Sequence, residues 1–316
     1  MKNPFSALLC LCLMFFATSC EPENSEENEP EAEDIIEIPD EHFKFALVST
    51  NSIDTNGDGV GDRNIDLNND GEIQRSEAEA IQGLIITFNF PGIQKFIDLS
   101  GIENFVNLKY IKMTHFWFSP DAGAPGSYIN TYDFTALKKL EYLELNNMST
   151  NYLDVLDLSG LSALKEVRLI NNRPLLQDSW DEDYKIPLNY LVVDMEGVSS
   201  LTSLDITNSF LKIDFCQVPS LKELNMFYLE GGEPEVFDFH CLTNLEWLNI
   251  GENSIHSLIL KNNSVLNTLL AQDIGSADNG NYYYLEYICI DDIPEEFEQI
   301  ASLRNEDTVV VTDCEF

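Results

Sequence analysis

Apolar residues recur through most of the chain in one repeated pattern. Each copy begins with apolar-Asp-apolar, continues with one further apolar residue, and ends in a Leu-x-x-apolar-x-apolar step. One copy reads Leu156-Asp157-Leu158, then Leu161, then Leu164, Val167 and Leu169. The aspartates of the successive copies are Asp98, Asp133, Asp157, Asp194, Asp214 and Asp238. Weaker copies surround Ile86, Leu258 and Ile288, so the repeats extend over residues 81–290.

This pattern predicts a solenoid. In the Leu-x-x-Leu-x-Leu step alternate side chains point to the same side, so each step is a short strand with its leucines inward. Units of roughly 20 residues of this kind are typical of leucine-rich repeats, in which each coil buries its apolar edge only by stacking on its neighbours. We therefore predict an α/β solenoid, a right-handed superhelix of leucine-rich repeats with short coils that are mostly strand and loop.

The repeats differ in length at one edge. The aspartate lies seven residues before the first leucine of the next strand in all copies except the first, whereas the connection after each strand varies from 8 to 25 residues. Insertions on one face of a solenoid often mark its binding face. These insertions carry Trp117 and Trp180. Such side chains either pack their own loop onto the solenoid or form an exposed platform for a sugar ring or a peptide.

The strand residues between the inward leucines should face the concave surface. Aromatic and acidic side chains are frequent there, which suits a cationic or hydroxyl-rich partner; a solvated outer face is the alternative. With the two insertion tryptophans, the candidate ligand contacts are Tyr110, Trp117, Tyr142, Trp180, Phe227, Trp247 and Tyr287.

Two acidic loops precede the repeats, in a predicted N-terminal cap of residues 36–80. A short amphipathic helix from Pro39 to Leu47 opens this cap, and a helix capped by Ser76 and Glu79 follows the second loop. The second loop matches the twelve-residue EF-hand pattern, with oxygen ligands early, a glycine for the turn and a glutamate at position 12. Its predicted calcium ligands are Asp66, Asn68, Asp70, Glu72 and Glu77.

The first loop is less complete. Asp54, Asn56, Asp58 and Asp62 begin a similar pattern, but Ile65 occupies the twelfth position. This loop resembles the calcium loops of thrombospondin type 3 repeats, and it is either a second calcium site or a turn without metal. Extracellular calcium is millimolar, so we expect any bound calcium to be structural.

The N-terminal segment has the features of a targeting signal. Residues 1–19 form a predicted secretion signal, with an apolar run too short to span a bilayer. The run ends in Ala17-Thr18-Ser19-Cys20, which resembles the lipobox of bacterial lipoproteins and makes Cys20 the predicted lipidation site; ordinary secretion is the alternative. Residues 20–35 form an acidic tether, which is either a plain spacer or a surface-export signal like that of Bacteroidetes lipoproteins.

Charge and motifs exclude several function classes. The chain has 17 basic and 55 acidic residues, a net charge of −38, so a general nucleic-acid binder is excluded. No catalytic motif, phosphate loop or zinc-ligand spacing is found, and we predict no enzymatic activity.

Four cysteines remain after the signal and Cys20. We predict a disulfide between Cys289 and Cys314, which would hold a C-terminal cap of residues 291–316. Cys216 and Cys241 lie in adjacent coils, and either a bridge or two free buried thiols fits their positions.

The opening Ile38-Pro39-Asp40, both acidic loops, the repeats and the ending from Ile288 to Cys314 together resemble internalin-like leucine-rich repeat proteins of Bacteroidetes. The resemblance implies a surface-displayed binding module. We therefore expect a calcium-stabilised, lipid-anchored outer-membrane protein, exposed at the cell surface or facing the periplasm. It would bind a protein partner at the concave face and insertion edge. A glycan-binding protein of a nutrient-uptake system is the alternative.

Overall fold

The computed structural model describes residues 34–89, 97–115, 131–148, 153–174, 190–229, 236–274, 277–278, 281–282 and 285–314. The chain divides into a unit of residues 1–33, none of which is described, and a unit of residues 34–316. Only the second unit is treated below.

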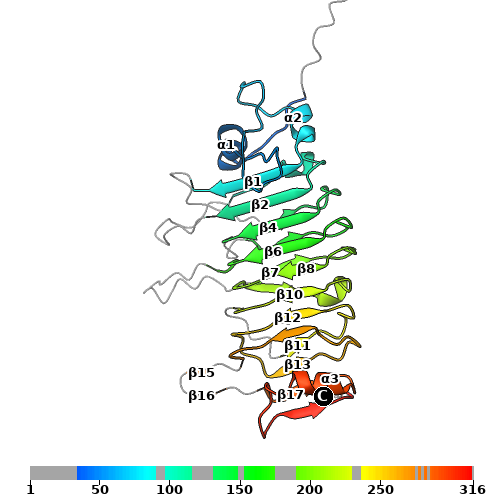
Figure 1. Cartoon of the computed structure of the whole chain (residues 1–316). Coiled ribbons are helices and arrows are strands. Elements are labelled where there is room, and N and C mark those ends of the chain that lie inside the picture. Colours follow the sequence, from blue (N-terminus) through cyan, green and yellow to red (C-terminus); the bar gives the residue numbers. More distant parts are fainter. Residues whose placement is uncertain are drawn as a thin grey trace, which may run out of the picture. The chain divides into compact units, whose positions relative to one another are not determined.

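One parallel sheet of eight strands runs through this unit, and it is called the long sheet here. Its strands follow chain order, each separated from the next by the rest of a coil (Figure 1). They are β1 (Gly83–Phe88), β2 (Tyr110–His115), β4 (Tyr142–Asn146), β6 (Glu166–Ile170), β8 (Ser203–Asp205), β10 (Glu223–Asn225), β12 (Trp247–Asn249) and β14 (Thr268–Leu270).

Two shorter parallel sheets supply the other strand of each coil. The first short sheet contains β3 (Thr131–Asp133), β5 (Val155–Asp157), β7 (Leu191–Asp194) and β9 (Leu211–Ile213). The second short sheet contains β11 (Val236–Asp238), β13 (Ser257–Ile259), β17 (Tyr287–Cys289) and β18 (Val309–Val311). A two-stranded antiparallel sheet is formed by β15 (Ala277–Asp278) and β16 (Asn281–Tyr282).

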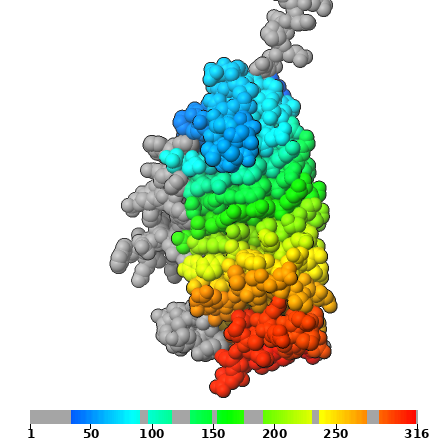
Figure 2. All heavy atoms as spheres, viewed as in Figure 1, coloured from blue at the N-terminus to red at the C-terminus, as the bar shows by residue number. Residues whose placement is uncertain are grey.

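The repeated leucines form one continuous core. Leu143, Val167 and Leu204 are paired in register on successive strands of the long sheet and are almost fully buried. Because each coil covers only the apolar edge of the next, burial depends on stacking, and successive parts of the chain form bands in Figure 2. The predicted solenoid of mostly parallel strands is therefore confirmed.

The repeated aspartate has a structural role. In each copy its carboxylate accepts a hydrogen bond from the main-chain N–H two residues later, as Asp157 does from Ser159 at 2.9 Å. This Asx turn ends the short strand and turns the chain toward the next one. The same contact is made by Asp98, Asp133, Asp194, Asp214 and Asp238.

The N-terminal cap contains two helices, α1 (Glu41–Ser49) and α2 (Arg75–Ala80). Asp40 caps α1 by accepting the N–H groups of His42 and Phe43, both at 2.9 Å. The predicted capping residues of α2 are wrong by two positions. Gln74 is the N-cap and Glu77 occupies position N3, because the Glu77 carboxylate accepts the Gln74 N–H at 3.0 Å.

The C-terminal segment continues the solenoid as well as capping it. The helix α3 (Pro294–Gln299) follows β17, and β18 then pairs in parallel with β17. The 3₁₀ turns η1 (Ile102–Asn104) and η3 (Phe215–Gln217) complete the described elements.

Candidate functional site

The two acidic loops of the N-terminal cap have the same hydrogen-bond pattern. In the first, the Gly59 N–H donates to Asp54 Oδ2 at 2.9 Å; in the second, the Gly71 N–H donates to Asp66 Oδ2 at the same distance. Both glycines have φ near +80°, which a residue with a Cβ rarely adopts. The two loops therefore share this glycine turn, although only the second matches the full EF-hand pattern.

Glu77 distinguishes the second loop. Its two carboxylate oxygens accept the main-chain N–H of Leu67 at 2.7 Å and of Gln74 at 3.0 Å, so the side chain spans from the start of the loop to the helix α2. The first loop has Ile65 at this position, and that side chain is fully buried in the core. Asp62 instead accepts the Thr55 hydroxyl and lies seven residues from it.

The residues of the second loop suit a hard divalent cation such as calcium. Carboxylate and amide oxygens of Asp66, Asn68, Asp70 and Glu77 are gathered around one turn, and each carboxylate has more lone pairs than the N–H groups use. The Glu72 N–H lowers the pKa of Asp70 below its usual value. The pKa of Asp54 is also lowered, since hydrogen bonds led by Gly59 outweigh the opposing effect of burial. Ionised carboxylates are the form that binds calcium.

On the face of the long sheet opposite the buried leucines, two rows of side chains lie in register. One row contains Tyr110, Tyr142, Glu166, Ser203, Glu223, Trp247 and Thr268. The neighbouring row contains Lys112, Glu144, Arg168, Asp205, Asn225, Asn249 and Leu270. The sequence predicted that most of these residues face the same side of the sheet. The strand pairing shows which of them are neighbours and can form ion pairs or ring contacts.

In the N-terminal half of the sheet the charges alternate and pair with one another. The Lys112 ammonium lies 3.1 Å from Glu144, and the Arg168 guanidinium lies 3.6 Å from Asp205. The rings of Tyr110 and Tyr142 stack with centroids 4.6 Å apart. This half of the surface is therefore largely neutralised internally.

Glu144 is the centre of that half, with only 5% of its surface exposed. Burial opposes its ionisation, but hydrogen bonds from the Tyr142 hydroxyl, Lys112 and Asn146 outweigh burial and lower its pKa. Burial and the contact with Glu144 raise the pKa of Tyr142. The cluster is thus an ionised carboxylate held by three donors.

The C-terminal half of the long sheet is different. Leu270 ends β14 and is 45% exposed, and Trp247 on β12 is half-buried with Glu223 and Thr268 as its register partners. Phe227 and Tyr228 are 38% and 42% exposed but lie in the turn after β10, so Phe227 is not on the strand itself as predicted. The Asn249 amide donates to Asn225 at 3.0 Å beside these side chains. We call Phe227, Tyr228, Trp247 and Leu270 the aromatic patch.

One predicted contact is misplaced, and others cannot be located. Tyr287 lies on β17, which belongs to the second short sheet and pairs with β13 and β18, so it is not part of the long-sheet stripe. The last strand of the long sheet is β14, and the strand of the Leu285–Ile290 copy belongs to the second short sheet instead. Cys20, Trp117 and Trp180 fall outside the described residues.

Both cysteine pairs are disulfides in this structure. Cys289 is bonded to Cys314, with Cα atoms 5.5 Å apart. Cys216 is bonded to Cys241, with Cα atoms 5.0 Å apart, so of the two alternatives for this pair the structure has the bridge. The side chains of Cys216 and Cys241 are not buried.

His240 was not singled out by the sequence. Its Nε2 lies 3.1 Å from the Cys241 sulfur and its Nδ1 lies 2.8 Å from Asp238. The three groups Cys216, His240 and Cys241 have the proximity of a metal site. The two sulfurs are bonded to each other, however, and metal ligation requires thiolates.

Within the described ranges, no helix has the length and apolar character needed to cross a membrane.

These features define a parallel-strand solenoid with an acidic double loop at one end and a partly aromatic long sheet. No known family model matches the chain, and neither does any curated protein. Among solved structures, it is similar to the functional domain of InlJ from Listeria monocytogenes, with 16% identity and a TM-score of 0.26 over 76% of this chain and 64% of that domain.

Two further solved structures are internalins from Listeria monocytogenes str. 4b F2365. Internalin C2 matches with 18% identity and a TM-score of 0.27 over 86% of this chain and 93% of that one. InlF matches with 18% identity and a TM-score of 0.19 over 86% and 95%. Because these TM-scores are low, the fold is assigned from the strand pairing of this chain itself.

Proposed function

We propose that the protein is a calcium-stabilised, lipid-anchored surface protein that binds a protein partner through the long sheet. The aromatic patch is the observation that supports this most directly. Large exposed apolar side chains on an otherwise acidic and polar surface mark interaction sites, and aromatic residues dominate the energetics of interfaces. The alternating charges of the N-terminal half are paired within the chain, so they contribute less to attraction of a partner.

The lipid anchor and the cell-surface position rest on the sequence alone, through Cys20 and the acidic tether that follows it. Labelled palmitate incorporated into the protein, and lost in Cys20→Ala, would support the anchor. Proteinase treatment of intact cells would then distinguish the outer face from the periplasmic face.

Photo-crosslinking tests the partner. A benzophenone amino acid in place of Trp247 should form one discrete protein adduct on intact cells, whereas the same group in place of exposed Val192, on the first short sheet, should form none. Equal adducts at both positions, or none at Trp247, would contradict the proposal.

Glycan binding is the second candidate, since half-buried Trp247 lies in the same patch as the Asn225–Asn249 amide pair, and sugar sites combine an aromatic face with polar groups. A glycan array with the purified protein separates the two. Tight sugar binding that is lost in Trp247→Ala would replace the protein-partner proposal.

A further inference from the structure

The first and second short sheets lie on the side of the coils opposite the long sheet, and together we call them the outer ladder. This ladder is interrupted between β9 and β11. Their coils are neighbours, because β10 and β12, which directly follow them in the chain, pair in the long sheet. Among the described residues, however, β9 pairs only with β7 and β11 only with β13. The first and second short sheets therefore meet at a break, and each presents an edge strand to it.

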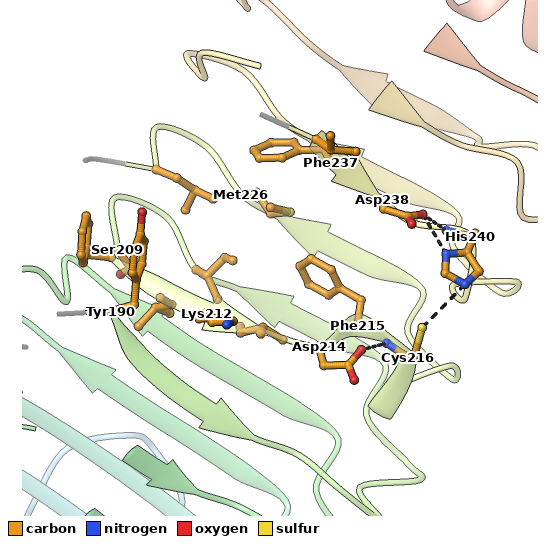
Figure 3. Close-up of a pocket in the computed structure, with 16 residues that line it drawn as sticks. Tyr190, Ser209, Lys212, Asp214, Phe215, Cys216, Met226, Phe237, Asp238 and His240 are labelled. Carbon is orange, nitrogen blue, oxygen red and sulfur yellow. Dashed lines mark hydrogen bonds and ion pairs between the residues drawn. The ribbon is translucent and has the colours of Figure 1, made fainter. Parts of the chain in front are cut away.

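A cavity of about 540 Å³ lies at this break (Figure 3). Its lining is mainly apolar and includes Phe210, Leu211, Ile213, Met226, Val236 and Phe237. Leu211 and Ile213 on β9 are only half-buried, whereas Leu191 and Val193, their register partners on β7, are buried. The difference arises because, in the part of the chain that the structure describes, no strand pairs with β9 on the side away from β7.

Among the described residues, main-chain groups without a strand partner face the break from both strands. In a parallel ladder, successive residues direct their N–H and C=O groups to opposite neighbours. The Leu191 N–H donates to Phe210 O at 3.2 Å, so the groups of Leu211 and Ile213 point away from β7. The Phe239 N–H donates to Ile259 O at 3.0 Å, so the groups of Val236 and Asp238 point away from β13.

The break between β9 and β11 is closed at the end where the two strands finish. The Cys216–Cys241 disulfide joins the two coils just after β9 and β11, and the rings of Phe215 and Phe239 are 5.6 Å apart beside it. The cavity extends from there toward Tyr190, which stacks on Phe210. A segment entering the break can therefore pair with the strands only at the end away from the disulfide.

The outward face of the break carries two exposed carboxylates, in a chain of net charge −38: Asp214 directly follows β9, and Asp238 ends β11. The basic side chains in the cavity lining are Lys212 on β9 and His240, whose Nδ1 lies 2.8 Å from Asp238. Inward positions on both strands are apolar. An alternating apolar and basic strand matches these two faces.

We infer that the break binds an extended peptide segment of a partner protein. One apolar side chain enters the cavity, the main chain hydrogen-bonds to the edge of β11 at Val236, and a basic side chain lies near Asp214 and Asp238. Addition of a strand to an open sheet edge is an established way of recognising extended peptides. This site is separate from the long sheet and does not depend on its proposed function.

Fluorescence anisotropy with a synthetic probe tests the inference. The probe is a fluorescein-labelled pentapeptide of alternating isoleucine and arginine, and its control has the same sequence with alternate main-chain nitrogens methylated. The purified protein should bind the probe saturably and the methylated control at least tenfold more weakly. Equal binding of both would show charge attraction only and overturn the inference, as would the absence of binding.

Val236 supplies the matched variants. It is the first residue of β11 and 47% exposed, a position where proline is tolerated, and its N–H faces the break. Val236→Pro should weaken probe binding at least fivefold, whereas Val236→Thr keeps the N–H and should bind within twofold of the wild type. Unchanged affinity in a folded Val236→Pro protein would contradict pairing at this edge; the methylated peptide tests the same bond if that variant does not fold.

Discussion

Cys216 and Cys241 are bonded across two adjacent coils whose described outer strands, β9 and β11, do not pair with each other. On the outer side, strand hydrogen bonds join successive coils from β3 to β9 and from β11 to β18. Here the covalent bond holds the coils together next to the break. The disulfide therefore links the two coils at a place where hydrogen bonds between β9 and β11 do not.

The two disulfides offer a matched comparison, because each joins residues separated by 25 positions. Loss of a crosslink that closes a loop of this length costs about 3.5 kcal/mol of unfolding free energy when the unfolded chain alone is affected. We expect that loss for Cys216→Ser with Cys241→Ser, and the same for Cys289→Ser with Cys314→Ser, from guanidinium unfolding. A loss under about 1 kcal/mol for the first pair would show that its bond contributes little.

Calcium should raise the melting temperature of the wild-type protein. Binding to the folded state at about 100 times the dissociation constant adds about 2.7 kcal/mol, which corresponds to an increase of several degrees between EDTA and millimolar calcium. Asp66→Ala should abolish the part of this shift that comes from the complete loop, because it removes the first ligand of that loop.

Asp54→Ala reports on the first loop, and exposed Asp292→Ala serves as the control and should keep the full shift. A partial loss in Asp54→Ala would assign a second ion to that loop. Identical melting with and without calcium in the wild type would remove calcium from the proposed function.

Glu144→Ala should destabilise the protein by about 3 kcal/mol, since it leaves Lys112 and the Tyr142 hydroxyl without their shared acceptor on a partly buried surface. Exposed Glu223→Ala on β10 is the control and should change the unfolding free energy by less than about 0.5 kcal/mol. Equal effects of the two substitutions would contradict a structural role for the Glu144 cluster.

Glu296 on α3 should make stability depend on pH. Its burial raises its pKa to about 7, outweighing the hydrogen bond that it accepts from the Asp291 N–H. Because the folded-state pKa exceeds the unfolded value, the stabilising contribution is complete below pH 4.5 and is lost as the pH rises through 7.

Glu296→Gln should therefore flatten the melting temperature between pH 5 and pH 8 and raise it at the upper end, relative to the wild type. The neighbouring exposed Glu295→Gln should leave the wild-type profile unchanged. A Glu296→Gln profile that still falls with pH as the wild type does would assign the dependence to another group.

Local patterns predicted the repeating part of this protein. The spacing of Leu164, Val167 and Leu169 forces alternate side chains to one side, and a coil of this kind can bury them only by stacking on a copy of itself. The Asp66–Glu77 loop was likewise recognisable, because its geometry depends on residues close together in the chain. The α2 cap was misplaced because Glu77 serves both the loop and the helix.

Tertiary structure decided everything that depends on which coils are neighbours. No local signal shows that Lys112, Glu144, Arg168 and Asp205 would pair in one row, or that Tyr287 would join the outer ladder. The same holds for the break between β9 and β11 and for His240 beside a disulfide. These features depend on the register between strands about 20 or more residues apart, which the stacking of whole coils determines and the sequence of a single coil does not.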